Sequence, residues 1–189
     1  MRIIGGGARG RKLFTPRDRQ IRPTSDKVKE AIFNILSGLL GGFEGLTVLD
    51  VFSGTGNLGI EALSRGGELA VFIDNSREAT QLVSRNLAQT GFVTSSRIVA
   101  KEAMVALGIL ENSGSLFDLV FLDPPYNFGL AERVLSYLAT SRIIGPDSII
   151  VAEFSSREDL PSVYDRLHEF NRRVYGDTAV SFLRLDTAG

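Results

Sequence analysis

The chain has 189 residues, 43% of them apolar, and a formal net charge of −1, which suits one globular domain with a full hydrophobic core. It has no cysteine and one histidine, His168. Disulfides, thiol nucleophiles and cysteine-ligated metal sites are therefore excluded, and no carboxylate cluster has the spacing of a metal site. With no apolar run of about 18 residues and no signal-peptide core at its start, we expect a cytoplasmic protein without a membrane span.

Positive charge is concentrated at the start of the chain. Residues 1–30 carry nine basic and three acidic side chains, a net charge of +6, whereas the rest of the chain sums to −7. A basic arm on an acidic domain favours an anionic partner, nucleic acid above all, although a solvated tail gives the same pattern. The predicted nucleic-acid-binding residues are Arg9, Arg11, Lys12 and Arg22.

The sequence divides into an N-terminal arm, residues 1–22, and a single domain, residues 23–189. The arm is rich in Gly and Arg. Its segments 2–5 and 11–14 flank a Gly-rich stretch, a pattern that is compatible with a short hairpin.

The domain begins with a helical pattern and then alternates strands with helices. Cap residues at 24–26 precede apolar side chains at helical spacing, and Gly41-Gly42 ends this run. Strands are predicted over residues 46–51, 69–73, 96–100, 117–122 and 148–154. A short helix is predicted after the first strand and ends at residue 63. Three further helices are predicted over residues 76–91, 102–110 and 129–138. Because the strands are almost continuously apolar, they indicate a mostly parallel sheet with helices on both faces.

The tail has a different pattern. Segments 172–175 and 178–185 are joined through Gly176 and Asp177, which is a signal for an antiparallel hairpin. The sequence therefore predicts an α/β fold, with a mostly parallel sheet that ends in a C-terminal antiparallel hairpin.

A glycine-rich loop follows the first predicted strand. Residues 54–59 match G-x-G-x-x-G, the dinucleotide fingerprint, and Asp74 and Glu102 follow the next two strands at the edge where such sheets bind ligands. Asp50 would repel a pyrophosphate, but it suits the ammonium and sulfonium of S-adenosylmethionine. A dinucleotide site and a tight turn with no ligand are the alternatives. The predicted cofactor-binding residues are Asp50, Ser53, Gly54, Thr55, Gly56, Asp74, Asn75, Glu102 and Ala103.

A second candidate site follows the fourth predicted strand, in the sequence Asp123-Pro124-Pro125-Tyr126. The two prolines fix φ and hold Asp123 extended, which makes a stiff loop. The Asp123 carboxylate and the Pro124 carbonyl can accept both N–H bonds of an exocyclic amine, while Tyr126 stacks on the base. We therefore predict Asp123, Pro124 and Tyr126 as catalytic residues for methyl transfer to a base amine. A proline-rich strand terminator with a surface Tyr is the alternative.

Several segments carry a resemblance to a known family. They are residues 1–13, residues 22–36 beginning Arg-Pro-Thr-Ser-Asp, the loop 49–59, the segment 59–66 reading Gly-Ile-Glu-Ala-Leu-Ser-Arg-Gly, and the loop 123–126. In these segments the chain resembles the bacterial 16S ribosomal RNA guanine-N2 methyltransferases of the RsmD type. The resemblance spans nearly the whole chain.

The resemblance implies a seven-stranded class I, Rossmann-like methyltransferase fold. It also implies methyl transfer from S-adenosylmethionine to N2 of a guanine in small-subunit rRNA, within an assembled or assembling 30S particle, and we expect a monomer. Carried over by position, Asp50, Gly54 and Gly56 line the cofactor, Asp74 binds its ribose and Glu102 lies near its adenine. At Asp74 the family usually has Glu, and at Glu102 and the residue before it Gly-Asp.

Other functions remain open at this point. The Asp-Pro-Pro-Tyr loop is shared with DNA adenine-N6 methyltransferases, although the chain is short for a separate DNA-recognition domain. The glycine pattern alone permits a dinucleotide-dependent oxidoreductase, and the fold alone permits a non-enzymatic RNA-binding module. Glu61, in the helix after the glycine loop, is either a solvated residue or, as the resemblance favours, an anchor for that loop.

Overall fold

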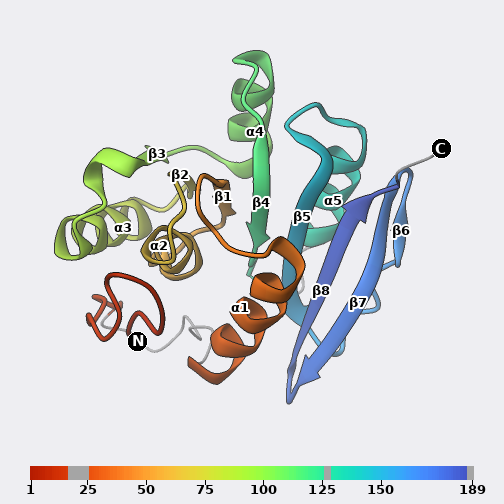
Figure 1. Ribbon diagram of the computed structural model, residues 1–189. Coiled ribbons are helices and arrows are strands. Elements are labelled where there is room, and N and C mark those ends of the chain that lie inside the picture. Colours follow the sequence, from red (N-terminus) through yellow and green to blue (C-terminus); the bar gives the residue numbers. More distant parts are fainter. Residues whose placement is uncertain (17–25, 126–128, 187–189) are drawn as a thin grey trace.

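The computed structural model describes residues 1–16, 26–125 and 129–186 (Figure 1). Its strands are β1 Thr47–Val51, β2 Leu69–Ile73, β3 Ser96–Val99, β4 Phe117–Leu122, β5 Ile144–Ser155, β6 Val163–Tyr164, β7 Leu167–Tyr175 and β8 Thr178–Leu185. Its helices are α1 Asp26–Leu40, α2 Asn57–Ser64, α3 Arg77–Thr90, the 3-10 turn η1 Val93–Ser95, α4 Ala103–Asn112 and α5 Leu130–Thr140. Among these described residues, no helix is long and apolar enough to cross a membrane.

All strands of the described ranges belong to one sheet, in the order β3-β2-β1-β4-β5-β8-β7-β6. The first five strands in this order are parallel, whereas β8, β7 and β6 join antiparallel. The chain moves from β1 outward to β3 and then returns to β4 on the other side of β1. In open α/β sheets, ligands bind at the carboxyl ends of the strands where the order reverses in this way. A ligand site is therefore expected at the carboxyl ends of β1 and β4.

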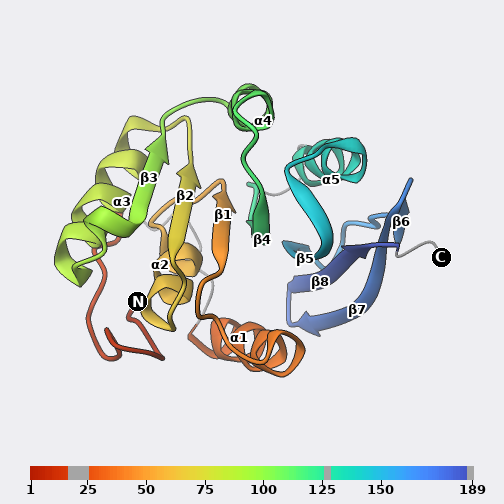
Figure 2. The same ribbon diagram turned by 45° about the horizontal axis from the view of Figure 1, so that its top comes forward.

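Helices cover both faces of the parallel part of the sheet (Figure 2). Because successive side chains of a strand point to opposite faces, Val48 packs with the helices α1, α2 and α3, whereas Leu49 packs with α4 and α5. The side chains of Val48 and Leu49 are both fully buried. The same alternation in β2 and β4 explains why these strands are apolar throughout, and the expected two-sided covering is confirmed.

The sheet differs from the expectation in three places. It has eight strands rather than seven, because the two residues of β6 are too few to show a periodicity. Strand β7 begins at Leu167 rather than at residue 172, since a register shift between Glu169 and Asn171 interrupts the alternation. Strand β5 begins at Ile144 rather than at residue 148, because Pro146 falls within it where a register shift accompanies the pairing with β4.

The first sixteen residues lie against the domain rather than away from it (Figure 1). Ile3, Ala8 and Leu13 are buried in the apolar cluster that contains α2 and α3. Where the sequence was compatible with a hairpin, the structure has a single antiparallel bridge between Arg2 and Lys12. Backbone hydrogen bonds from Ile3 to Arg11 and from Leu13 to Met1 join the same two stretches, so a short hairpin-like turn is present and packs on the domain.

Candidate active site

The glycine loop after β1 turns the chain sharply into α2. Phe52 has a φ of 61°, and Gly54 and Gly56 have φ values of 54° and 75°. A left-handed backbone at a non-glycine residue costs about 1–3 kcal/mol and is concentrated at functional sites. Gly56 caps α2 without a side-chain hydrogen bond. The loop thus combines the glycines that the sequence predicted with strain at Phe52 that it did not.

Asp50 contacts the backbone of α2 just after the glycine loop. Its carboxylate is only 2% exposed, and its Oδ2 accepts the backbone N–H of Gly59 at 2.9 Å. Burial raises the pKa of Asp50 to about 8, with a smaller contribution from the charge of Asp74, while the Gly59 N–H acts in the opposite direction. The described contact of Asp50 is therefore with the backbone of α2, directly after the glycine loop.

Asp74 joins the glycine loop to the next strand end. Its Oδ2 accepts the N–H of Gly54 at 2.9 Å, and its Oδ1 accepts the N–H of Ser76 at 2.9 Å. The carboxylate is partly exposed, so it keeps lone pairs for a ligand. This geometry suits the acceptor of a ribose diol that the sequence predicted at this position.

A pocket of about 120 Å³ opens beside this loop at the carboxyl ends of β1, β2 and β3. It is lined by Phe52, Ile73, Asp74, Asn75, Lys101, Glu102, Ala103 and Leu130. Apolar walls with a few polar groups at the rim are typical of sites that bind small molecules and cofactors. The pocket brings together the predicted residues Asp74, Asn75, Glu102 and Ala103.

The other predicted cofactor residues lie deeper. Ser53 and Thr55 are both buried. The Ser53 hydroxyl has no hydrogen-bond partner among the described residues, whereas the Thr55 hydroxyl donates to the Met1 sulfur at 3.3 Å. The Glu102 carboxylate caps α4 by accepting the N–H of Val105 at 3.2 Å. Glu102 thus has a local structural role besides its place in the pocket.

Four pocket residues were missed in the sequence: Phe52, Ile73, Lys101 and Leu130. Phe52 lies inside the quoted loop, but its aromatic ring gave no signal for a lining role. Lys101 precedes Glu102 and is exposed. Leu130 begins α5, which follows β4 on the other side of the point where the strand order reverses. Only the tertiary structure could therefore place Leu130 in the pocket.

The Asp-Pro-Pro loop lies next to the glycine loop. Val51 and Leu122 are register partners, so Asp123 follows β4 beside Phe52, and its N–H donates to the Val51 carbonyl at 3.4 Å. Asp123 is partly exposed and Pro124 is buried. Tyr126 lies outside the described residues.

A second carboxylate stands on the other side of Asp123. Leu122 pairs with Ala152 of β5, so the next residues, Asp123 and Glu153, are neighbours at the strand ends. Glu153 is 4% exposed. No sequence pattern points to Glu153, because its proximity to Asp123 depends on the register between β4 and β5.

The predicted nucleic-acid residues of the arm are on the surface. Arg9, Arg11 and Lys12 are exposed, and Arg11 donates through Nη1 to the Gln89 carbonyl of α3 at 2.8 Å. Arg22 lies outside the described residues. In the described part of the chain, no group of three carboxylate or histidine side chains is placed to hold a metal ion.

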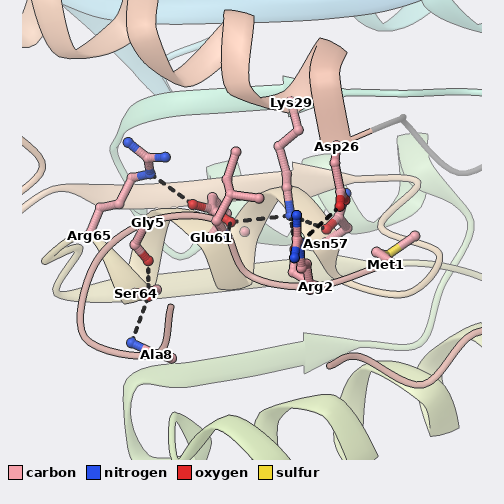
Figure 3. A network of polar contacts seen from close by, with 12 residues as sticks. Met1, Arg2, Gly5, Ala8, Asp26, Lys29, Asn57, Glu61, Ser64 and Arg65 are labelled. Atoms are coloured by element: carbon pink, nitrogen blue, oxygen red, sulfur yellow. Dashed lines mark hydrogen bonds and ion pairs between the residues drawn. The ribbon is translucent and has the colours of Figure 1, made fainter. Parts of the chain in front are cut away.

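A buried ion pair supports the glycine loop from the opposite side (Figure 3). Lys29 of α1 and Glu61 of α2, both with fully buried side chains, lie 3.2 Å apart. The Lys29 ammonium also donates to the Arg2 carbonyl at 2.6 Å and to the Asn57 amide oxygen at 2.8 Å. Burial lowers the pKa of Lys29, and Glu61 opposes this shift. Glu61 is therefore an anchor and not a solvated residue.

The same carboxylate holds the N-terminal segment. Glu61 accepts the N–H of Ile4 at 2.9 Å through Oε2 and the Arg65 guanidinium at 2.9 Å through Oε1. Ser64 donates its hydroxyl to the Gly5 carbonyl at 2.6 Å and accepts the N–H of Ala8 at 2.9 Å (Figure 3). One helix thus positions both the glycine loop and the first residues of the chain.

The strand order reverses between β1 and β4, and a glycine loop and an Asp-Pro-Pro loop lie at that point. This arrangement is typical of Rossmann-like methyltransferases. The chain belongs to the family described as Conserved hypothetical protein 95, whose model matches residues 1–184. It is 34% identical to Ribosomal RNA small subunit methyltransferase D of Escherichia coli (strain K12) over 189 residues, which cover 100% of this chain and 92% of that protein.

Two further similarities cover nearly the full length of both proteins. The chain is 35% identical over 184 residues to YlbH of Bacillus subtilis (strain 168), covering 97% of this chain and 98% of that protein. The solved structure of yhhF from Escherichia coli superposes with a TM-score of 0.84 at 34% identity, covering 98% of each chain. The expected family is thereby confirmed.

We expect Gly59→Ala to destabilise the protein and weaken cofactor binding. A Cβ at this position would lie 2.5 Å from Cε1 of the buried Phe72 and 3.1 Å from Oδ2 of Asp50, and such overpacking costs about 1–3 kcal/mol. Gly108→Ala is the matched control, because a Cβ there in α4 would meet no atom within 4 Å. Urea unfolding measures both variants, and equal stability of the two would contradict the close packing at Gly59.

Asp50 predicts a pH dependence of stability. Because its pKa is raised from 3.8 to about 8, the folded chain keeps a proton that the unfolded chain releases. This contribution to stability is present at low pH and is lost as the pH rises through that window, with a slope approaching about 1.4 kcal/mol per pH unit. Asp50→Asn keeps an acceptor for Gly59 and removes the titration. Urea unfolding from pH 5 to 8 should therefore show a flatter dependence in the variant, and parallel curves would refute this assignment.

Proposed function

We propose that the protein transfers a methyl group from S-adenosylmethionine to the exocyclic N2 of a guanine in small-subunit ribosomal RNA. The observation that carries this proposal is the position of the Asp123-Pro124 loop beside the glycine loop, at the strand ends where the sheet order reverses. The name of the Escherichia coli relative, Ribosomal RNA small subunit methyltransferase D, supports the substrate class.

The residues of the pocket fit the cofactor. Asp74, already oriented by the Gly54 and Ser76 amides, accepts hydrogen bonds from the ribose diol. Phe52 and Ala103, which line the pocket with Glu102, would pack against the adenine. When bound, S-adenosylmethionine supplies an electrophilic methyl group on a sulfonium. The cationic end of such a ligand, placed near the buried Asp50 carboxyl, would lower the pKa of that group and favour its charged form.

Asp123 and Pro124 activate the amine. The lone pair of an exocyclic amine is delocalised into the ring, so the nitrogen is a poor nucleophile. When the Asp123 carboxylate and the Pro124 carbonyl accept its two N–H bonds, the nitrogen becomes more pyramidal and its lone pair points toward the pocket. The nitrogen gives up one N–H proton when it accepts the methyl group, and the Asp123 carboxylate would be placed to take that proton. Stacking of the base on Tyr126 remains part of the proposal.

The basic arm provides the contact with the RNA backbone. Arg9, Arg11 and Lys12 are exposed on the segment that Glu61 and Ser64 hold against α2. Such side chains bind phosphates with little sequence preference. We propose that this contact places the protein, as a monomer, on rRNA within an assembled or assembling 30S particle.

Transfer of labelled methyl groups tests the substrate class. The protein is incubated with labelled S-adenosylmethionine in three separate reactions. They contain undermethylated small ribosomal subunits, free 16S rRNA and duplex DNA, respectively. We expect label in the rRNA of the subunits. Label in duplex DNA would support an adenine-N6 enzyme instead, and saturable binding of NAD(P) without binding of S-adenosylmethionine would support an oxidoreductase.

A further inference from the structure

Phe14 is an exposed aromatic residue on a firmly held backbone. Its side chain is 41% exposed. Its N–H donates to Asn86 Oδ1 at 2.7 Å, and its carbonyl accepts from Asn86 Nδ2 at 3.1 Å. Asn86 is completely buried in α3, and its Nδ2 also donates to the Thr55 carbonyl at 2.9 Å. One amide thus fixes Phe14 relative to the glycine loop, while the ring remains at the surface.

The Phe14 ring is paired with a cation. The guanidinium carbon of Arg85, the residue before Asn86 in α3, lies 4.2 Å from the ring centroid. Arg85 is itself exposed. An aromatic ring and a guanidinium plane that lie together form a flat, cationic surface, and both groups stack on nucleobases.

The surroundings of this pair are positively charged. Arg11 contacts the Gln89 carbonyl, one helical turn beyond Arg85, so the two arginines and Phe14 share one surface of α3. Arg9 and Lys12 are exposed on the same N-terminal segment. Within the described ranges, none of these four cations forms an ion pair. Unpaired cations around an exposed ring match an anionic partner that has flat apolar groups.

We propose that Phe14 and Arg85 form a stacking platform for an unpaired base of RNA, with Arg9, Arg11 and Lys12 binding the neighbouring phosphates. The inference rests on the proposed rRNA substrate. It adds a second base contact, apart from the catalytic loop and joined to the glycine loop through Asn86. Sequence-independent stacking of unpaired bases on aromatic side chains is a recurring way of holding single-stranded RNA.

Binding of two RNA probes to the full-length protein tests the platform. One probe is a hairpin with a single-stranded loop, and the other is a blunt duplex of the same length and charge. Phe14→Leu keeps an apolar side chain and removes the aromatic face. We expect it to weaken binding of the loop probe about 5- to 100-fold, to leave duplex binding unchanged, and to leave the salt dependence intact. Phe14→Tyr should restore loop binding.

Arg85→Ala provides an independent variant, because it leaves the buried contacts of Asn86 in place. It should weaken loop binding and lower the salt dependence by about one phosphate contact. Leu39→Ala, which changes another exposed apolar side chain (47% exposed) on α1, is the matched control and should bind both probes normally. Unfolding curves for all variants separate loss of contact from loss of structure.

Three results would overturn the platform: wild-type affinity of Phe14→Leu for the loop probe, an equal loss for both probes, or loss with Tyr as well as with Leu. Phe14-dependent binding of an acidic peptide in place of the loop probe would assign the surface to a protein partner. Phe14-dependent RNA binding without methyl transfer would leave the platform standing and refute the proposed function. If Phe14→Leu transfers methyl groups with unchanged loop binding and unchanged KM, the platform is refuted and the proposed function stands.

Discussion

Asp123→Ala is expected to reduce kcat strongly while leaving the affinity for S-adenosylmethionine nearly unchanged. Loss of one oriented acceptor costs on the order of 2–4 kcal/mol in the transition state, by analogy with oxyanion-hole deletions, which corresponds to roughly 30- to 1,000-fold in rate. The carboxylate follows β4 beside Phe52 rather than within the lining of the pocket. Single-turnover methyl transfer and equilibrium binding of the cofactor measure the two effects separately.

The same strand offers a matched control for Asp123. Asp118 lies at the opposite end of β4, where its Oδ2 accepts the N–H of Thr47 at 2.7 Å. Asp118→Asn keeps an acceptor there and should leave the rate unchanged. If Asp123→Ala lowers cofactor affinity as much as Asp50→Ala does, the division of roles between the two carboxylates is wrong.

Glu61→Ala is expected to destabilise the fold by about 3–5 kcal/mol, because it leaves the Lys29 ammonium buried without its counter-ion. Both side chains are fully buried, and the change also removes the acceptors for Ile4 and Arg65. Urea unfolding monitored by circular dichroism gives the loss directly. The N-terminal segment should also become accessible to proteases, since Glu61 holds its backbone.

A surface ion pair provides the contrast for Glu61. Arg142 and Glu111 lie 4.0 Å apart, and the Arg142 side chain is 87% exposed. Arg142→Ala should therefore change stability by less than about 1 kcal/mol. The double variant Lys29→Met with Glu61→Leu should recover much of the loss. A Glu61→Ala variant as stable as Arg142→Ala would show that the buried pair does not anchor α2.

Local patterns were sufficient to predict the parts of the fold that depend on neighbouring residues. The bounds of β2 and β4 agree with the apolar runs, and α3 lies within the predicted range 76–91, with Ser76 and Gly91 as its caps. The glycine loop was found because its left-handed turns need glycine at positions 54 and 56. Asp74 and Glu102 were found because parallel strands end at one edge of the sheet.

Contacts between distant segments could not be predicted in this way. Glu153 lies beside Asp123 only through the register of β4 and β5, and Leu130 reaches the pocket from across the sheet reversal. Phe14 and Arg85 meet although about 70 residues separate them along the chain. The Asp50 carboxylate, predicted to lie beside a cationic ligand, also accepts the Gly59 amide, a contact that requires the packing of α2 on β1.

The identity of the methylated nucleoside tests the proposed reaction most directly. After methyl transfer to undermethylated small subunits, the rRNA is digested to nucleosides and analysed by liquid chromatography and mass spectrometry. The account predicts that the label is in N2-methylguanosine and that Asp123→Ala removes it. Label in N6-methyladenosine, or no labelled guanosine at all, would contradict it.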